Sequence, residues 1–287
     1  QPLLNDGLIV VVPGFIGKTE KGAITTLGRG GSDVTAMILA RSLSADQVIL
    51  VTDVDGIMSA DPRMIEKPRM LKDIDIDVLV GLADSGSKFI HKKALRYKSP
   101  TIDVKVMNNA AGDLRSEGTL IRGGFPENIM VEPHPETSMA VTIVGKSVSE
   151  SPKTLQGILQ EVKRFDAPIL GMSLDHDSLI LYLPMNDSSP RLLEALHSVV
   201  AADERTKAMA VKQDLTFMSV RGVGLEETPG IVSVISRALS SAKINIYGIF
   251  TITSSVLLFV DLKDREQATR LVKESVRRYT TLEGDRS

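Results

Sequence analysis

The stretch Thr25-Thr26-Leu27-Gly28-Arg29-Gly30-Gly31-Ser32-Asp33-Val34-Thr35-Ala36 decides how the first half of this chain folds. Three glycines surround one arginine, and Ser-Asp then opens an apolar run with helical spacing. Glycine tolerates positive φ and lets a ligand approach the main chain closely. The first N–H groups of a helix and the positive end of its dipole attract anions. The sequence therefore predicts an anion site, with the Arg29 guanidinium available to a carboxylate or phosphate.

Other glycine-rich motifs do not fit this stretch. A dinucleotide-binding fingerprint requires a third glycine where Asp33 stands, and a P-loop requires a lysine that is absent between Lys21 and Lys67. A purely structural loop remains an alternative, with Ser32 as the N-cap of the helix and Asp33 facing its dipole.

Four segments resemble aspartate kinase in their residues, order and spacing. They are Gly14–Gly17, Thr26–Asp33, Thr52–Ile57 with Asp61–Arg63, and the weaker Gly86–His91. The resemblance implies transfer of the ATP γ-phosphoryl group to the side-chain carboxylate of L-aspartate, the first step of lysine, threonine and methionine biosynthesis. It also implies ATP and aspartate as ligands, Mg²⁺ as the counterion of the nucleotide, and a cytoplasmic location. Phosphoryl transfer of this kind depends mainly on positioning and charge neutralisation.

The resemblance assigns a role to each matching residue. Catalysis is expected from Asp33 and Arg29, and substrate binding from Phe15, Arg29, Gly30, Gly31, Ser32 and Asp33. Nucleotide binding is expected from Thr52, Asp53, Met58, Asp61, Arg63 and Lys88. Met58 departs from the family, which often has an aromatic residue there. Taken alone, Phe15 could be a core residue and Asp61–Arg63 a turn with a surface ion pair.

The first half has the pattern of an α/β domain. Apolar runs at Leu8–Val12 and Gln47–Val51 predict buried strands, and the segment Val34–Leu43 between them predicts a helix. Fully apolar strands joined by a helix are typical of a parallel sheet. Ligands bind beyond the carboxyl ends of such strands, so we expect Gly28–Asp33 and Thr52–Arg63 to converge.

From Ser138 the pattern changes to β-α-β-β-α-β twice, a ferredoxin-like internal repeat. In the second copy Gly222–Ile231 and Ala242–Ile246 resemble an ACT regulatory module. The predicted architecture is therefore α/β. Residues 1–124 would form the C-terminal part of an amino-acid-kinase α/β/α sheet domain, residues 137–211 the first ACT module and residues 212–284 the second, to which a strand from 126–136 is a candidate addition.

ACT modules bind amino acids at interfaces between copies, often across a dimer. The resemblance thus implies feedback by a lysine or threonine effector and a homodimer through these modules. Candidate effector-binding residues are Ser151, Ile169, Gly224, Pro229, Gly230, Asn245 and Ile246.

Composition adds few constraints. A net charge of −2 gives no reason to expect nucleic acid or membrane partners, and the absence of cysteine excludes disulfides and thiol chemistry. No apolar run reaches transmembrane length. The four histidines lack metal-ligand spacing, so no protein-held metal is expected.

One family motif is missing. The Lys-Phe-Gly-Gly run, which supplies the catalytic lysine and a phosphate loop in aspartate kinases, does not occur between Gln1 and Gly14. We therefore expect the chain to be an incomplete kinase that is inactive alone. A non-catalytic, amino-acid-sensing regulatory subunit remains the alternative.

Overall fold

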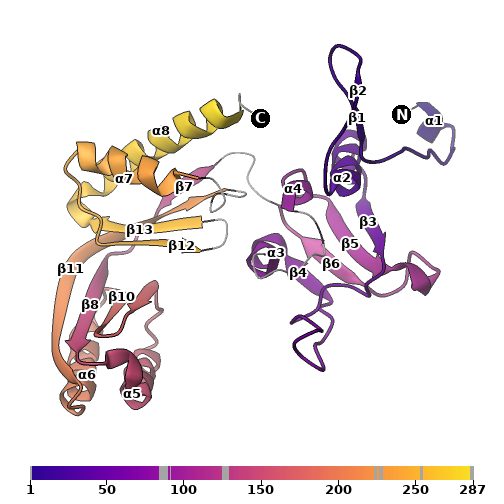
Figure 1. The fold of residues 1–287 in the computed structure, drawn as a ribbon. Helices are drawn as coiled ribbons and strands as arrows, with labels where there is room; N and C mark the ends of the chain where they lie inside the picture. Colours follow the sequence, from indigo (N-terminus) through magenta and orange to yellow (C-terminus); the bar gives the residue numbers. More distant parts are fainter. Residues whose placement is uncertain are drawn as a thin grey trace. The chain divides into compact units, whose positions relative to one another are not determined.

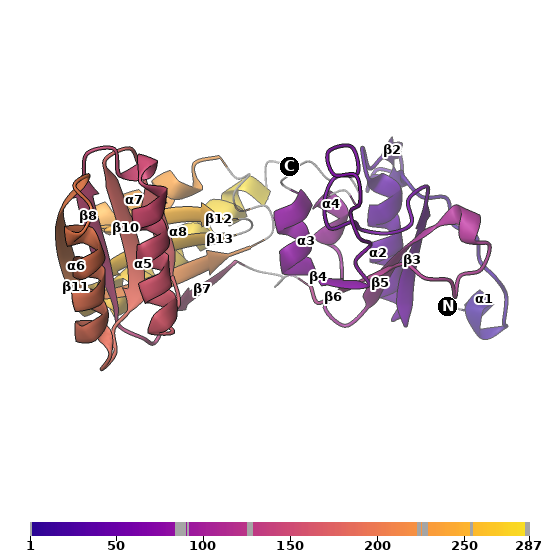
Figure 2. The same cartoon turned by 90° about the horizontal axis from the view of Figure 1, so that it is seen from below.

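The computed structural model describes residues 2–83, 90, 92–124, 129–222, 225, 229–252 and 255–284. The chain forms two compact units, one built mainly from residues 1–128 and the other mainly from residues 129–287. Figures 1 and 2 show the helices and strands of both. Within the described residues, no helix is both long and apolar enough to cross a membrane.

The described part of the first unit contains a mixed four-stranded sheet in the order β3-β5-β6-β4. Its strands are β3 (Gln47–Thr52), β4 (Asp73–Asp75), β5 (Asp103–Asn108) and β6 (Thr119–Arg122). β3 runs parallel to β5 and β4 parallel to β6, whereas β5 and β6 are antiparallel. The expected parallel arrangement is therefore present for two of the three strand pairs, whereas β6 runs against β5.

The other described elements of this unit are short strands and helices. They are α1 (Pro2–Asn5), the hairpin β1 (Ile16–Lys18) and β2 (Ile24–Thr26), α2 (Gly31–Leu43), α3 (Ile76–Ala83), α4 (Lys92–Leu95) and the 3₁₀ turn η1 (Asn109–Ala111). α2 buries Val34, Met37 and Ala40 along one face, the spacing of an amphipathic helix. A short connection leads from α2 into β3, and the two pack together. The first turn of α2 therefore lies at the sheet edge where β3 ends.

The predicted buried strand at Leu8–Val12 is not formed. Ile9 is 95% exposed and Val11 is 90% exposed. The apolar run predicted burial, but a strand also needs a hydrogen-bonded neighbour, and this segment pairs with none of the described strands. Val10 and Val12 instead line an apolar groove with Leu39 and other residues of α2.

The second unit is built on a seven-stranded sheet among the described residues, in the order β12-β13-β11-β8-β10-β9 with β7 also paired to β11. Its strands are β7 (Met130–Pro133), β8 (Ser138–Gly145), β9 (Gly171–Leu174), β10 (Ser178–Pro184), β11 (Thr206–Arg221), β12 (Gly248–Ile252) and β13 (Ser255–Asp261). Its helices are α5 (Pro152–Arg164), α6 (Ser189–Ala201), α7 (Ile231–Ser241) and α8 (Arg265–Gly284), with 3₁₀ turns η2 (Val148–Glu150) and η3 (Leu262–Asp264). The α/β fold class is confirmed.

One long strand connects the two repeats. The first half of β11, Thr206–Lys212, pairs with β8, and the second half, Leu215–Arg221, pairs with β13 and β7. The register shifts between these halves, where Asp214 has a φ of 56°. The predicted boundary between residues 211 and 212 thus falls inside a continuous strand.

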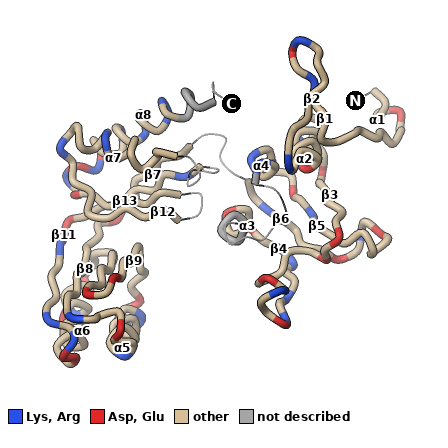
Figure 3. The backbone as a smooth tube through the Cα atoms, in the orientation of Figure 1, with Lys and Arg blue, Asp and Glu red and all other residues tan. Residues whose placement is uncertain are grey.

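Two clusters of buried side chains can be described in the second unit, beside further buried residues of α7 and α8 such as Ile235 and Val272. Ile158 and Val162 of α5 and Leu192 and Leu196 of α6 pack with β8 and β10 in the first cluster. In the second, the Tyr182 ring stacks on the Phe259 ring with 4.0 Å between centroids. Charges of both signs are interspersed along α5, α6 and α8 (Figure 3), in keeping with the small net charge of the chain.

Candidate functional site

The glycine-rich stretch forms the entrance to α2. Gly28 and Gly30 have φ of 74° and 72°, a left-handed conformation that favours glycine. Gly30 is the N-cap residue and Gly31 the first residue of the helix. The interpretation of Ser32 as N-cap is therefore wrong, because the left-handed Gly30 lets the helix begin two residues earlier.

Phe15 packs directly against this entrance. A Cβ added to Gly31 would lie 2.9 Å from the Phe15 ring and 2.9 Å from Leu27, so only glycine fits there without a shift. The Gly31 N–H donates to the Gly28 carbonyl at 3.0 Å and closes the loop. Phe15 itself is 41% exposed and has a φ of 72°.

The predicted substrate residues are thus brought together. Phe15 and Gly31 touch, Gly30 caps the helix, and Ser32 and Asp33 occupy its first turn. Arg29 and Ser32 are exposed, whereas Asp33 is half-buried. An exposed guanidinium beside the N-terminus of a 13-residue helix is an arrangement that attracts an anion.

The first of the predicted nucleotide-binding residues lie at the end of β3. Thr52 is the last residue of β3, and its hydroxyl donates to the Asp53 carboxylate at 3.1 Å. Asn108, the last residue of the parallel strand β5, donates through Nδ2 to the Asp55 carboxylate at 2.7 Å. These polar groups therefore share the sheet edge at which α2 begins.

The remaining nucleotide candidates lie on the connection from β3 to β4. Met58 forms an isolated antiparallel bridge with Met70. The Asp61 carboxylate accepts the Arg63 N–H at 2.9 Å, so Asp61 stabilises a turn, and both side chains are exposed. Lys88 lies outside the described residues.

The effector candidates of the first repeat lie at opposite ends of α5. Ser151 precedes the helix, and its hydroxyl donates to Asp203 at 2.9 Å. Ile169 follows the helix, just before β9, and is 41% exposed. Since α5 is 13 residues long, the two do not form one site within this repeat.

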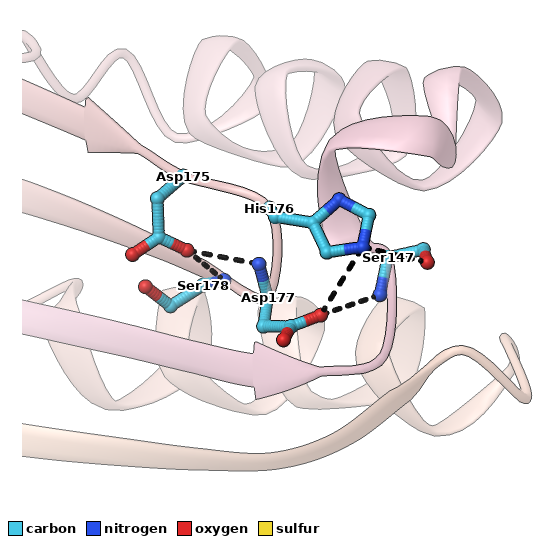
Figure 4. A network of polar contacts seen from close by, with 5 residues as sticks. All are labelled: Ser147, Asp175, His176, Asp177 and Ser178. Atoms are coloured by element: carbon cyan, nitrogen blue, oxygen red, sulfur yellow. Dashed lines mark hydrogen bonds and ion pairs between the residues drawn. The ribbon is translucent and has the colours of Figure 1, made fainter.

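A polar network holds the loop after β8 against the turn between β9 and β10 (Figure 4). The Asp177 carboxylate accepts the Ser147 N–H at 2.8 Å, and His176 Nε2 lies 3.2 Å from the Ser147 hydroxyl. The N–H groups of Asp177 and Ser178 donate to Asp175, and these bonds, that from Asp177 first, lower the pKa of the Asp175 carboxyl.

This network contains a serine, a histidine and aspartates, yet it is not a charge relay. A relay uses one ring nitrogen toward the hydroxyl and the other toward the carboxylate. Here the same nitrogen, Nε2, faces both the Ser147 hydroxyl and, at 3.8 Å, the Asp177 carboxylate. The network therefore fixes the loop rather than activating Ser147.

The effector candidates of the second repeat are separated in the same way. Gly230, with a φ of 87°, is the N-cap of α7, and the Tyr279 hydroxyl donates to the neighbouring Pro229 carbonyl. Asn245 and Ile246 follow the C-terminal end of that 11-residue helix. Gly224 lies outside the described residues.

Three residues that the sequence did not assign a role make contacts in the candidate sites. Thr35 accepts the Phe15 N–H, Lys93 of α4 donates to the Leu27 carbonyl at 2.9 Å, and Asp203 accepts the Ser151 hydroxyl. Each of these three bonds joins segments far apart in sequence, so no local pattern indicates it. Among the described residues, no group of three or more His, Asp or Glu is placed to hold a metal ion.

Comparison with known proteins covers most of the chain. Residues 1–108 match the model of the amino acid kinase family. The chain is 28% identical over 284 residues to an aspartokinase of Mycolicibacterium smegmatis, covering 92% of this chain and 64% of that protein. It is 29% identical over 290 residues to an aspartokinase of Thermus thermophilus, covering 95% and 68%.

A solved structure of aspartate kinase from Synechocystis has the same fold, with a TM-score of 0.77 at 24% identity over 95% of this chain and 50% of that one. The similarity to aspartokinases at 28–29% identity over most of the chain confirms the resemblance seen in the motifs. The chain spans 60–68% of the length of the curated relatives from Mycolicibacterium smegmatis, Geobacillus stearothermophilus and Thermus thermophilus.

Proposed function

We propose that the chain carries the aspartate-binding and nucleotide-binding segments of an aspartate kinase. The observation that supports this most directly is the exposed Arg29 on the left-handed glycine loop that opens α2, with Phe15 against Gly31. Relatives named aspartokinase, similar along nearly the whole chain, support aspartate as the substrate.

In the proposed reaction a side-chain carboxylate oxygen of aspartate attacks the γ-phosphorus of ATP. The bond from that phosphorus to the β,γ-bridging oxygen breaks, and ADP is the leaving group. The other product is an aspartyl phosphate. Arg29 pairs with a substrate carboxylate, and the Gly30 and Gly31 amides and the Ser32 hydroxyl add hydrogen bonds. The attacking carboxylate is already ionised at neutral pH, so Asp33 acts by orienting a phosphate-facing lysine rather than as a base.

Nucleotide binding is proposed for Thr52, Asp53, Met58, Asp61, Arg63 and Lys88. The exposed Asp53 and Asp61 at the end of β3 and in the following turn suit a Mg²⁺ ion that arrives with the nucleotide. Such an ion keeps several waters and phosphate ligands and needs no protein cage. When bound, Mg²⁺ neutralises charge on the phosphates.

Regulation is proposed for the second unit. Residues 137–211 and 212–284 would act as ACT modules, with a strand from 126–136 added to the second; the pairing of β7 with β11 supports this addition. A lysine or threonine effector and a homodimer would complete the sites, because Ser151 and Ile169, like Gly230 and Asn245, lie at opposite ends of a helix. A partner module could bring such ends together.

A second candidate function is a regulatory subunit that senses an amino acid without catalysis. The observation in its favour is that most of residues 129–287 form a compact unit built on a sheet of its own. Under the first proposal we expect no aspartyl phosphate from the 287 residues alone, since they hold no Lys-Phe-Gly-Gly run. Supplying the missing lysine and phosphate loop on another polypeptide would restore activity under the first proposal only.

Calorimetric titration with aspartate, lysine and threonine, each with and without Mg-ATP, tests the proposal. We expect aspartate to bind in the presence of Mg-ATP and Arg29→Ala to remove that binding. Lys21→Ala is the matched control, because it also removes an exposed positive charge, from the loop of the β1–β2 hairpin. It should leave aspartate binding unchanged. Binding of lysine or threonine without aspartate would favour the regulatory subunit instead.

A further inference from the structure

The Thr35 hydroxyl joins two parts of the candidate substrate site. It accepts the Phe15 N–H at 3.2 Å and donates to the Gly31 carbonyl at 2.8 Å. A hydroxyl has one proton to donate and lone pairs to accept, so both bonds form together. Thr35 lies in the second turn of α2 and is half-buried.

Only one of these bonds is explained by the helix. A threonine hydroxyl in a helix commonly donates to the carbonyl four residues earlier, as Thr35 does to Gly31. The bond to Phe15 spans 20 residues and adds nothing to the helix itself. It ties the entry of the β1–β2 hairpin to the glycine loop.

Phe15 needs such support because its backbone is unfavourable. A φ of 72° is rare for a side chain with a Cβ, and it persists only where the surroundings enforce it. The Phe15 carbonyl accepts the Leu27 N–H at 2.8 Å, so both main-chain polar groups of Phe15 are held. Conformations of this kind cluster at functional sites.

The consequence is a fixed spacing between an aromatic wall and an anion loop. The Phe15 ring lies against Gly31 where no Cβ fits, and the Leu27 carbonyl also accepts Lys93 Nζ at 2.9 Å. The peptide that follows Leu27 leads directly into Gly28 and Arg29. Movement of Phe15 would therefore change the space left for a ligand beside Arg29.

We propose that Thr35 is a positioning residue that sets the distance between Phe15 and the Arg29–Ser32 loop and thereby selects the length of the bound acidic amino acid. The inference rests on the proposed aspartate site and names a determinant of its specificity. Thr35 touches no reacting atom; it acts through Phe15 and Gly31.

The test uses the 287-residue chain with Thr35→Val, Thr35→Ser and Thr35→Ala. Titrations with L-aspartate and with L-glutamate, both in the presence of Mg-ATP, give the affinity for each amino acid. A titration with Mg-ATP alone gives the affinity for the nucleotide. Valine keeps the shape of threonine but removes both hydrogen bonds, and alanine removes them in a better helix former. Thr19→Val is the control, because the Thr19 hydroxyl likewise accepts a main-chain N–H, from Ala23, in the same unit.

We expect Thr35→Val and Thr35→Ala to weaken aspartate binding about tenfold, the scale of one lost hydrogen bond in a preorganised site, and to narrow the preference for aspartate over glutamate. The Mg-ATP affinity of both variants should stay unchanged. Thr35→Ser, which keeps the hydroxyl, should retain the preference for aspartate over glutamate. A merely structural role would lower all three affinities together with the melting temperature.

The outcomes separate the two proposals. If the unsubstituted chain does not bind aspartate, the proposed function fails, and a substrate role for Thr35 fails with it. If it does bind aspartate, but Thr35→Val or Thr35→Ala leaves the ratio of aspartate to glutamate affinity unchanged, the inference about Thr35 alone is overturned.

Discussion

The Ser151 hydroxyl donates a 2.9 Å hydrogen bond to the carboxylate of Asp203, although 52 residues separate them in sequence. Thr154 donates to the same carboxylate oxygen, and the other oxygen accepts the Arg205 N–H at 2.8 Å. Asp203 therefore fastens the start of α5 to the connection between α6 and β11. Any effector that used the Ser151 hydroxyl would have to compete with Asp203.

These bonds predict a pH-dependent contribution to stability. The hydrogen bond from Thr154, followed by those from Arg205 and Ser151, lowers the pKa of the Asp203 carboxyl. Because the folded pKa lies below the unfolded value of about 3.9, the contribution is present above that pH and is lost as pH falls through the folded pKa. We expect Asp203→Asn to destabilise the chain at pH 7 and to have a smaller effect once the pH falls below the folded pKa of Asp203.

Urea unfolding at several pH values measures this difference. Asp187→Asn, an exposed aspartate on the connection before α6, is the matched control. An Asp203→Asn effect of the same size at neutral and acidic pH would contradict the assignment of the low pKa to these bonds.

A close approach between β12 and β10 gives a second prediction. The Tyr182 hydroxyl donates to the Tyr247 carbonyl at 2.5 Å, and a Cβ added to Gly248 would lie 2.7 Å from Tyr182 Cζ and closer still to its hydroxyl. We expect Gly248→Ala to lower the free energy of unfolding by about 1–3 kcal/mol, the usual cost of overpacking.

A double-mutant cycle with Tyr182→Phe checks the cause. Removing the hydroxyl relieves the nearest clash, so Gly248→Ala should be less harmful in the Tyr182→Phe background. Additive effects of the two substitutions on denaturant unfolding would mean that the clash is elsewhere.

The helices were predictable because their signals are local. Val34–Leu43 was predicted as a helix and forms most of α2, which buries Val34, Met37 and Ala40 at three-residue intervals. The contact between Phe15 and Gly31 agrees with the order of the motifs, but only the resemblance placed both in one site. The bond between Thr35 and Phe15 could not be predicted, because its partners are set by the packing of the hairpin on α2.

The segment Leu8–Val12 is a case in which the sequence predicted a strand that the structure does not form. Its composition is that of a buried strand, and burial depends on a neighbour that the local sequence does not supply. The structure leaves Ile9 and Val11 exposed while Val10 and Val12 line the groove on α2. The alternation of a strand is thus retained without the pairing.

This alternation predicts two different responses to charge. Ile9→Lys with Val11→Lys should change the free energy of unfolding by less than about 0.5 kcal/mol, because both side chains are already in solvent. The same pair should reduce self-association, which exposed apolar side chains promote. Val10→Lys with Val12→Lys, the matched pair on the groove side, should destabilise more.

Thermal unfolding and sedimentation of the two double variants distinguish these responses. Equal destabilisation by both pairs would show that Ile9 and Val11 are buried in solution.

Lys98 is a buried lysine of the first unit. It is 4% exposed, and its ammonium donates to the carbonyls of Ile102 at 2.9 Å, Ser99 at 3.2 Å and Gly123. Burial lowers the pKa of Lys98, while the charge of Asp103 opposes that shift. The three carbonyls belong to the turn after α4, the residue before β5 and the residue after β6, so one side chain ties this turn to the ends of two strands.

Replacing Lys98 by methionine should therefore be costly even though the new side chain is apolar. The carbonyls would lose a buried donor, and we expect the free energy of unfolding to fall by about 1–3 kcal/mol. Lys105→Met is the control, because Lys105 also donates to two main-chain carbonyls, of Leu114 and Ser116, but is only half-buried. Denaturant unfolding should rank Lys98→Met as the more destabilised of the two, since water can replace the Lys105 ammonium more readily. The reverse ranking would mean that solvent reaches the Lys98 carbonyls in the folded chain.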